Sequence, residues 1–151
     1  MSEAADIHQP HREANCMTKA EETMANSKEA IVEALAALLD AFNAHDLDQI
    51  MSMFAEDCIL QMPRGDHPWG SRFVGKHAVR QGLAARFSGI PDVRYGDATH
   101  FVSGEVGITK WTLTGTHTNG NKVEVLGCDF YTFKDGKVIQ KDSYWKIVDK
   151  A

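Results

Sequence analysis

Short turn dipeptides divide the second half of this chain into strand-length pieces, and their spacing constrains the fold more than any other feature. The breaks are Ser103-Gly104, Asn119-Gly120 and Asp135-Gly136. Asn-Gly and Asp-Gly are the strongest short-range signals of a β-hairpin. The spacing predicts a meander of three long antiparallel strands at 106–117, 122–133 and 138–148, with a further strand at 92–102 paired with the first of them.

The first half of the chain has helical periodicity instead. Ser27 is the expected N-cap of a helix that runs to about Asn43. The apolar residues of this helix recur at helical spacing; they are Ile31, Leu35, Leu38, Leu39 and Phe42. Asp46 is expected to cap a short second helix.

Short elements then lead from the helices to the meander. A strand is expected at 57–62, a loop rich in turn residues at 63–74, and a third helix from Gly75 to about Gly89. Helices followed by antiparallel hairpins predict an α+β fold, in which a long twisted sheet curls around the N-terminal helices into a cone. A pocket is expected in such a concavity.

Residues 1–26 show no apolar periodicity, and we expect them to form a flexible extension before one domain at 27–151. Their first residues lack the basic start and apolar run of a secretory signal. No apolar stretch in the chain approaches the roughly 20 residues that a membrane span needs. We therefore expect a cytoplasmic protein with no membrane partner.

Charge and cysteine content exclude further classes. The net charge is −5, and Lys and Arg are spread without a basic run, which argues against a nucleic-acid partner. Cys16, Cys58 and Cys128 form no Cys-x-x-Cys pair, so neither a disulfide framework nor a structural zinc site is expected. No Gly-rich phosphate loop and no metal-ligand cluster stands out, and we expect no metal and no other cofactor.

Four stretches, in consistent order over about residues 27–148, resemble one known family. They are Ala41-Phe42-Asn43-Ala44-His45-Asp46-Leu47-Asp48, Phe54-Ala55-Glu56-Asp57-Cys58, Phe73-Val74-Gly75-Lys76 and Asp129-Phe130-Tyr131-Thr132-Phe133-Lys134-Asp135-Gly136-Lys137. With them the chain resembles the SnoaL-like family of the nuclear transport factor 2-like superfamily, whose fold is a cystatin-like cone. The superfamily hosts both enzymes and binding domains, so the resemblance implies the fold more than an activity.

The chemistry implied by the resemblance differs between relatives. Ketosteroid isomerases use a carboxylate base, a Tyr and a protonated Asp. Asp129 matches that Asp, but Met62 stands at the base and Leu38 at the Tyr, so we expect a different mechanism. SnoaL-like polyketide cyclases place an acid–base His where this chain has Asp129 and an Asp where it has Ser143, or Asp142 if the hairpin shifts by one. The resemblance thus makes Asp129 the candidate catalytic residue.

The register of the last hairpin decides what Asp129 faces, and two registers are open. If Asp135-Gly136 is a two-residue turn, Asp129 lies opposite Asp142, and two close carboxylates suit proton transfer. If the turn contains a bulge, Asp129 lies opposite Lys141, on the same side as Ser143 and Trp145. In that register Asp129 is either catalytic or half of a structural ion pair.

Other candidates for ligand binding each have a plain structural alternative. Trp111 and Tyr131 either line the pocket or fill the core, and the resemblance places Trp145 in the pocket wall. His117 is either an acid–base group at the pocket mouth or a surface residue. Trp69, on the 63–74 loop, is either a lid or a subunit contact. Arg64 and Arg72 either pair with an acidic ligand group or lie in solvent.

The sequence therefore favours a protein with a pocket for a small, apolar, carbonyl-bearing molecule, on which it performs cofactor-independent acid–base catalysis of the isomerase, cyclase or hydrolase type. The alternative is a non-catalytic ligand-binding or dimerisation domain. A homodimer is expected in both cases, because an exposed and partly apolar outer sheet face needs a cover.

Overall fold

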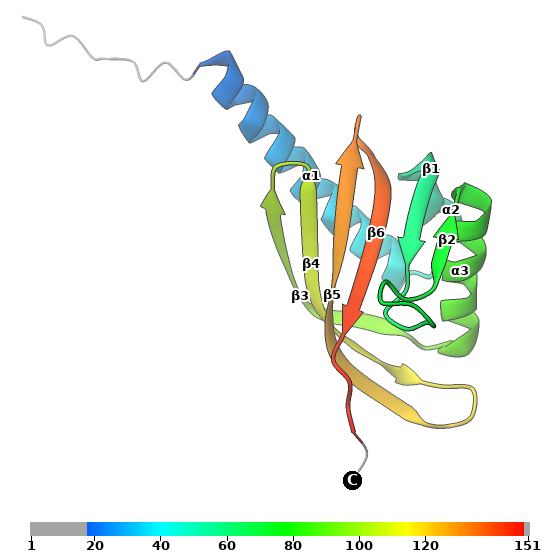
Figure 1. Ribbon diagram of the computed structural model, residues 1–151. Coiled ribbons are helices and arrows are strands. Elements are labelled where there is room, and N and C mark those ends of the chain that lie inside the picture. The colour runs from blue at the N-terminus through cyan, green and yellow to red at the C-terminus, as the bar shows by residue number, and fades with distance from the viewer. Residues whose placement is uncertain (1–17, 150–151) are drawn as a thin grey trace, which may run out of the picture.

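One six-stranded sheet organises residues 18–149, the part of the chain that the computed structural model describes (Figure 1). The elements are α1 (Lys19–Asn43), α2 (Leu47–Ser52), β1 (Phe54–Gln61), β2 (Arg72–Val74), α3 (Lys76–Gly89), β3 (Arg94–Ser103), β4 (Val106–Thr116), β5 (Lys122–Lys134) and β6 (Lys137–Trp145). The strand order is β2-β1-β6-β5-β4-β3, and among the strand pairs of residues 18–149 only β1–β6 is parallel. This confirms the predicted α+β fold with a curved, mostly antiparallel sheet.

The long helix α1 crosses one face of the sheet, which we call the inner face (Figure 1). Leu35 and Leu38 of α1 are almost fully buried there. The helix approaches β4 at Gly107, where an added Cβ would lie 2.9 Å from a Leu35 methyl carbon. Only glycine permits this close approach of helix and strand. Within residues 18–149, no helix is both long and apolar enough to cross a membrane.

The start of α1 differs from the prediction. The helix begins at Lys19, so the expected cap at Ser27 is wrong. Residues 19–26 contain neither Gly nor Pro, and Lys, Ala, Glu and Met are good helix formers, so nothing stops the helix at Ser27. Residues 1–17, most of the predicted flexible extension, lie outside the described residues.

The end of α1 is tied to the sheet by side-chain hydrogen bonds. The Asn43 amide donates to the Tyr95 carbonyl at 3.0 Å and accepts from the Tyr95 N–H at 2.8 Å. The predicted Asp46 cap is confirmed, since its carboxylate accepts from the Gln49 N–H at 3.0 Å. These contacts fix the helix end against the edge strand β3.

The β5–β6 hairpin combines features of both predicted registers. Asp135 and Gly136 have φ angles of 50° and 75°, and Lys134 pairs with Lys137, so the turn has two residues. One extra residue in β6, Ile139, then shifts the pairing, because Phe133 pairs with Val138 and Thr132 with Gln140. Further along, Asp129 therefore pairs with Ser143. Opposition of Asp129 to Asp142 or to Lys141 is wrong, because neither predicted register included a bulge inside the strand.

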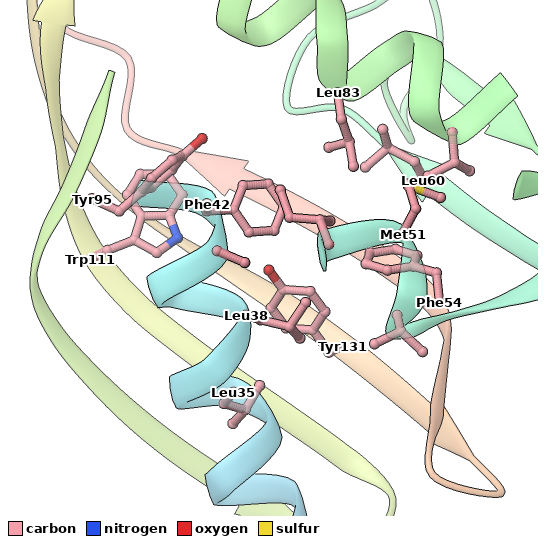
Figure 2. Packing of buried hydrophobic residues seen from close by; sticks show 14 of the residues in the cluster. Leu35, Leu38, Phe42, Met51, Phe54, Leu60, Leu83, Tyr95, Trp111 and Tyr131 are labelled. Atoms are coloured by element: carbon pink, nitrogen blue, oxygen red, sulfur yellow. The ribbon is translucent and has the colours of Figure 1, made fainter. Parts of the chain in front are cut away.

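The inner face carries a core of large aromatic and aliphatic side chains. Figure 2 shows Tyr95, Trp111 and Tyr131, from three different strands, pointing toward Leu38 and Phe42 of α1. The Trp111 ring covers Gly127, where an added Cβ would lie 2.5 Å from the ring. The same strands position the polar groups described next.

Candidate functional site

A buried carboxylate lies at the centre of the inner face. Asp129 is 4% exposed and projects inward from β5. Its Oδ1 accepts hydrogen bonds from Lys141 Nζ at 2.8 Å and from Ser143 Oγ at 2.6 Å, and its Oδ2 accepts from Trp111 Nε1 at 2.8 Å. Asp129, Lys141, Ser143 and Trp111 form what we call the polar cluster. Its carboxylate is therefore held by three donors from two neighbouring strands.

Lys141 supplies the compensating charge. Its Nζ also donates to Ser143 Oγ at 2.7 Å, so the serine hydroxyl accepts from the lysine and donates to the aspartate. The ammonium lies 5.3 Å from the centre of the Phe42 ring and 5.7 Å from that of Tyr131, within the range of cation–π attraction. The Lys141 side chain is only 7% exposed, but its ammonium contacts a carboxylate, a hydroxyl and two aromatic rings in place of water.

Two tyrosines beside the cluster are held in their neutral form. Burial raises the pKa of both Tyr95 and Tyr131, and the charge of Asp129 raises both further. The arrangement therefore combines one carboxylate and one ammonium with phenols that keep their protons.

The space beside the cluster is small. A hollow of about 10 Å³, which we call the inner hollow, is lined by apolar groups and the cluster: Phe42, Met62, Pro63, Leu83, Arg86, Tyr95, Trp111, Asp129, Lys141, Ser143 and Trp145. This volume holds about one water-sized atom. Aromatic side chains occupy the space around the inner hollow. A ligand can therefore bring a single atom, but not a ring, into contact with the polar cluster.

A larger hollow of about 280 Å³, the outer hollow, adjoins the inner one. Its walls are mainly apolar: Met62, Pro63, Phe73, Gly82, Ala85, Val123, Val125 and Trp145, with Arg64, Ser71, Arg86 and His117 as the polar lining. Met62, Pro63, Arg86 and Trp145 line both hollows. The volume lies just below the range of roughly 300–1,000 Å³ that is typical of ligand pockets.

Arg86 and Trp145 stand at the boundary between the hollows. The Arg86 guanidinium carbon lies 4.4 Å from the centre of the Trp145 ring. Burial lowers the pKa of Arg86, because a cation loses hydration there. The Arg86 guanidinium has no hydrogen bond or ion pair with any residue of the described range 18–149, and the negative charge nearest in effect is that of Asp129.

The structure brings most of the predicted site residues together. Trp111, Asp129, Ser143 and Trp145 all line the inner hollow. Tyr131 is buried beside Lys141, and His117 lines the outer hollow together with Trp145. The ion pair foreseen as a structural alternative, Asp129 with Lys141, is present at 2.8 Å.

Two of the predicted residues lie elsewhere. Trp69 is 43% exposed, stacks on His67 and Arg72, and lines neither hollow. Asp142 lies on the other face of the sheet, where its carboxylate accepts from the Tyr144 hydroxyl at 3.0 Å. The hypothesis of an Asp129–Asp142 carboxylate pair is therefore wrong.

Sequence reasoning missed one residue of the hollows in particular. Arg64 and Arg72 were considered either for a ligand contact or for solvent; Arg64 lines the outer hollow, Arg72 lines neither, and Arg86, which was not considered, lines both. The spacing contained the signal, because Arg86 follows the buried residues Val79 and Leu83 by seven and three positions on α3. No group of three or more His, Cys, Asp or Glu side chains that could hold a metal occurs within residues 18–149.

Several solved structures share this fold. A proposed polyketide cyclase from Xanthomonas campestris pv. campestris has a TM-score of 0.71 and 18% identity, over 80% of this chain and 93% of that chain. Bal32a, from a soil-derived mobile gene cassette, has a TM-score of 0.71 and 20% identity, over 80% and 92%. TerC, co-crystallised with polyporic acid, has a TM-score of 0.67 and 19% identity, over 78% and 92%.

Sequence comparison identifies the family. Among curated proteins, none matches this chain. The profile described as "SnoaL-like domain" matches residues 35–141, a span from the middle of α1 into β6 that contains Asp129 and Lys141. The cone-shaped sheet, the order of its elements and this match agree with one another, and the chain belongs to the SnoaL-like domain family.

Proposed function

We propose that this protein binds a small, largely apolar, carbonyl-bearing molecule in its outer hollow and performs acid–base chemistry on it with the polar cluster. Its activity would be of the isomerase, cyclase or hydrolase type and would need no cofactor. The observation that carries the proposal is the buried Asp129–Lys141 pair at the inner end of an apolar hollow. The predicted cytoplasmic location stays a prediction.

Stability alone does not account for the buried pair. Taking two charges out of water costs free energy that their attraction only partly returns, and apolar replacements of buried ion pairs are often neutral or stabilising. Buried charged groups beside a hollow are candidates for function for this reason. The structural relative TerC was co-crystallised with polyporic acid, which adds support through the shared fold alone.

The geometry suggests how the groups would divide the work. Since the inner hollow admits about one atom, the oxygen of a ligand carbonyl would reach the cluster while the body of the ligand stays in the outer hollow. Lys141 and Ser143 would donate hydrogen bonds to that oxygen. Asp129 would accept the proton that the activated carbonyl compound releases, and would return it later in the reaction.

The first test is binding. A thermal-shift screen with hydrophobic ketones and esters is expected to yield compounds that raise the melting temperature. A ligand present at about 100 times its dissociation constant should stabilise the fold by about 2.7 kcal/mol. If no carbonyl compound shifts the transition, the pocket proposal fails.

The second test is chemistry on the compounds that bind. Proton NMR in D₂O would follow the exchange of hydrogens next to the carbonyl, which reports proton abstraction without knowledge of the product. Asp129→Asn is expected to lower the exchange rate about 100-fold or more, the range for general acid–base groups. Asp142→Asn is the matched control, since that carboxylate lies on the opposite face. Equal rates in wild type and Asp129→Asn would remove the catalytic role.

The second candidate function is a non-catalytic binding or dimerisation domain. The small inner hollow favours it, because the polar cluster satisfies its own hydrogen bonds without a ligand. The outer face of the sheet also carries exposed large apolar side chains on β3, β5 and β6: Phe101, Leu126, Phe130 and Tyr144. We propose that this outer face pairs with a second copy of the chain in either case. Light scattering at micromolar concentration tests this, and the mass of a monomer would contradict it.

A further inference from the structure

The charges around the outer hollow do not balance. Arg64 and Arg86 line it, and none of its lining residues is acidic, although the whole chain has a net charge of −5. Asp129, in the adjoining inner hollow, is already paired with Lys141 at 2.8 Å. The hollow therefore has a positive interior in an acidic protein, and a field of this kind attracts anions.

Of the two arginines that line the outer hollow, Arg86 is the less exposed, since Arg64 lies in the exposed class and Arg86 is partly buried. A guanidinium has five N–H donors in one plane. Those of Arg86 meet no acceptor within residues 18–149, and the Trp145 ring covers the group at 4.4 Å. Arg80, on the same helix, shows the ordinary alternative, since it pairs with Asp48 at 2.7 Å. Arg86 is only partly exposed, and a cation that is partly withdrawn from water without a partner is costly, so Arg86 is suited to an acceptor that arrives from outside.

We propose that the outer hollow binds a compact, largely apolar carboxylic acid as its anion, with the carboxylate paired to Arg86. The inference rests on the proposed function, because it takes the outer hollow as the ligand site and adds the charge of the ligand. A carboxylate matches the planar fork of a guanidinium with two parallel hydrogen bonds. The apolar side chains of Met62, Phe73 and Val125 would contact the body of the ligand.

The position of Arg86 also orders the ligand along the hollow. Arg86 lines both hollows, so a carboxylate bound to it lies at the boundary with the polar cluster. A neutral ligand would leave the guanidinium unpaired, and a cationic one would be repelled by it. Ligand charge, rather than ligand shape alone, therefore sets the selectivity of this site.

The experiment compares matched ligands that differ in charge. Isothermal titration calorimetry would measure the dissociation constants of benzoate, 2-naphthoate and their neutral carboxamides. Hydrogen bonds to charged groups are the stronger class, so each carboxylate is expected to bind about tenfold or more tightly than its amide. Arg86→Met is expected to remove this preference, whereas Arg80→Met, the control on the same helix at a residue that lines neither hollow, keeps it.

Each outcome bears on a distinct claim. Equal affinity for carboxylates and amides in the wild type would overturn the inference and leave the small-molecule site intact. A preference that survives in Arg86→Met would overturn the assignment to Arg86; Arg86→Gln serves as a second variant if circular dichroism shows that the first is unfolded. Failure of all four compounds to bind would count against the proposed function and against this inference with it.

Discussion

Both faces of the β5–β6 hairpin depart from the usual distribution of side chains, in which charged groups are exposed and aromatic groups are buried. The inner face holds the charged pair Asp129–Lys141, with both side chains at most 7% exposed. The outer face presents Phe130 and Tyr144, which are 37% and 55% exposed and contact each other edge to face at 5.5 Å. Asp129 and Phe130 are neighbours in sequence, yet the charged one is buried and the aromatic one is in solvent.

This difference separates the two kinds of role that the molecule offers. Buried polar groups and exposed apolar patches are informative because neither arises from the ordinary sorting of residues by hydrophobicity. The buried charged pair of the inner face lies beside a hollow, which suits the binding of a small molecule. The exposed aromatic side chains of the outer face lie on the adjacent strands β5 and β6, an arrangement that suits contact with the surface of another protein. If the two faces are independent, a substitution on one face should leave the properties of the other unchanged.

Removal of one partner of the buried pair should have the largest effect. Asp129→Ala leaves Lys141 buried without a counter-charge, and we expect the free energy of unfolding to fall by about 3–5 kcal/mol. Urea denaturation measures this. Asp142→Ala, on the outer face of the adjacent strand, is the control and should change stability by about 0.5 kcal/mol or less.

The double variant Asp129→Leu with Lys141→Met tests whether the unpaired charge causes the loss of stability. It removes both charges together, so most of the stability lost in the single variant should return. If Asp129→Ala is as stable as the wild type, the Lys141 ammonium is hydrated in that variant, and the inner face is more accessible to water than its burial indicates.

Crowding of the inner face at Gly127 should have an intermediate effect. An added Cβ would lie 2.5 Å from the Trp111 ring and 2.4 Å from the Tyr144 carbonyl oxygen. Gly127→Ala is therefore expected to destabilise the fold by about 1–3 kcal/mol, as overpacking does. Gly89→Ala provides the comparison, because nothing lies within 4 Å of its Cβ position. Similar melting temperatures for the two variants would contradict the close packing of Trp111 on β5.

Alkaline pH should destabilise the fold more through the buried tyrosine of the inner face than through the exposed one of the outer face. Tyr131 has a raised pKa through burial and the charge of Asp129, whereas an unfolded tyrosine ionises at about 10. Above that pH the folded state holds more protons than the unfolded one, so stability falls as the pH rises further. Tyr131→Phe should lessen this fall by at most about 1.4 kcal/mol per pH unit.

Urea denaturation between about pH 8 and pH 11 measures this loss around the tyrosine pKa. The control is Tyr144→Phe, since Tyr144 is on the outer face and its pKa is raised mainly by the hydrogen bond to Asp142. If Tyr144→Phe changes the pH dependence more than Tyr131→Phe does, the inner phenol is not the sheltered one.

Substitution on the outer face should change stability least. Phe130→Lys places a charge where 37% of the side chain is already exposed, so the unfolding free energy of the monomer should change by about 0.5 kcal/mol or less. The same variant should convert the proposed dimer to a monomer in light scattering, because a charge on each copy would oppose pairing. A variant that stays dimeric would direct the search for an interface away from this face.

The fold was predictable because its signals are local. The Asn119-Gly120 and Asp135-Gly136 dipeptides mark hairpins directly, and strands β3 to β6 begin and end within a few residues of the predicted bounds. The inward direction of Asp129 was also predictable, since alternation along β5 follows from its apolar residues. The start of α1 was not, because a favourable cap such as Ser27 does not require the helix to begin there.

The details of the site depended on features that leave little trace in a sequence. The extra residue Ile139 has no Gly or Pro to mark a bulge, so the partner of Asp129 was misplaced by one or two positions. Arg86 was not singled out, because arginines usually lie on the surface, although its spacing from Val79 and Leu83 places it on the buried side of α3. Whether a hollow stays open beside it depends on how side chains from seven helices and strands and from the loops between them pack, which no local pattern specifies.

The extra residue in β6 has a consequence for how this hairpin tolerates insertions and deletions. Val138 and Lys141 both point inward although three positions separate them, which a regular strand does not permit. Loss of Ile139 would restore plain alternation and leave Lys141, Ser143 and Trp145 on the same side. Loss of Asp142, three positions further on, would instead turn Ser143 and Trp145 toward solvent. Changes of chain length that preserve the site are therefore confined to the turn side of Lys141.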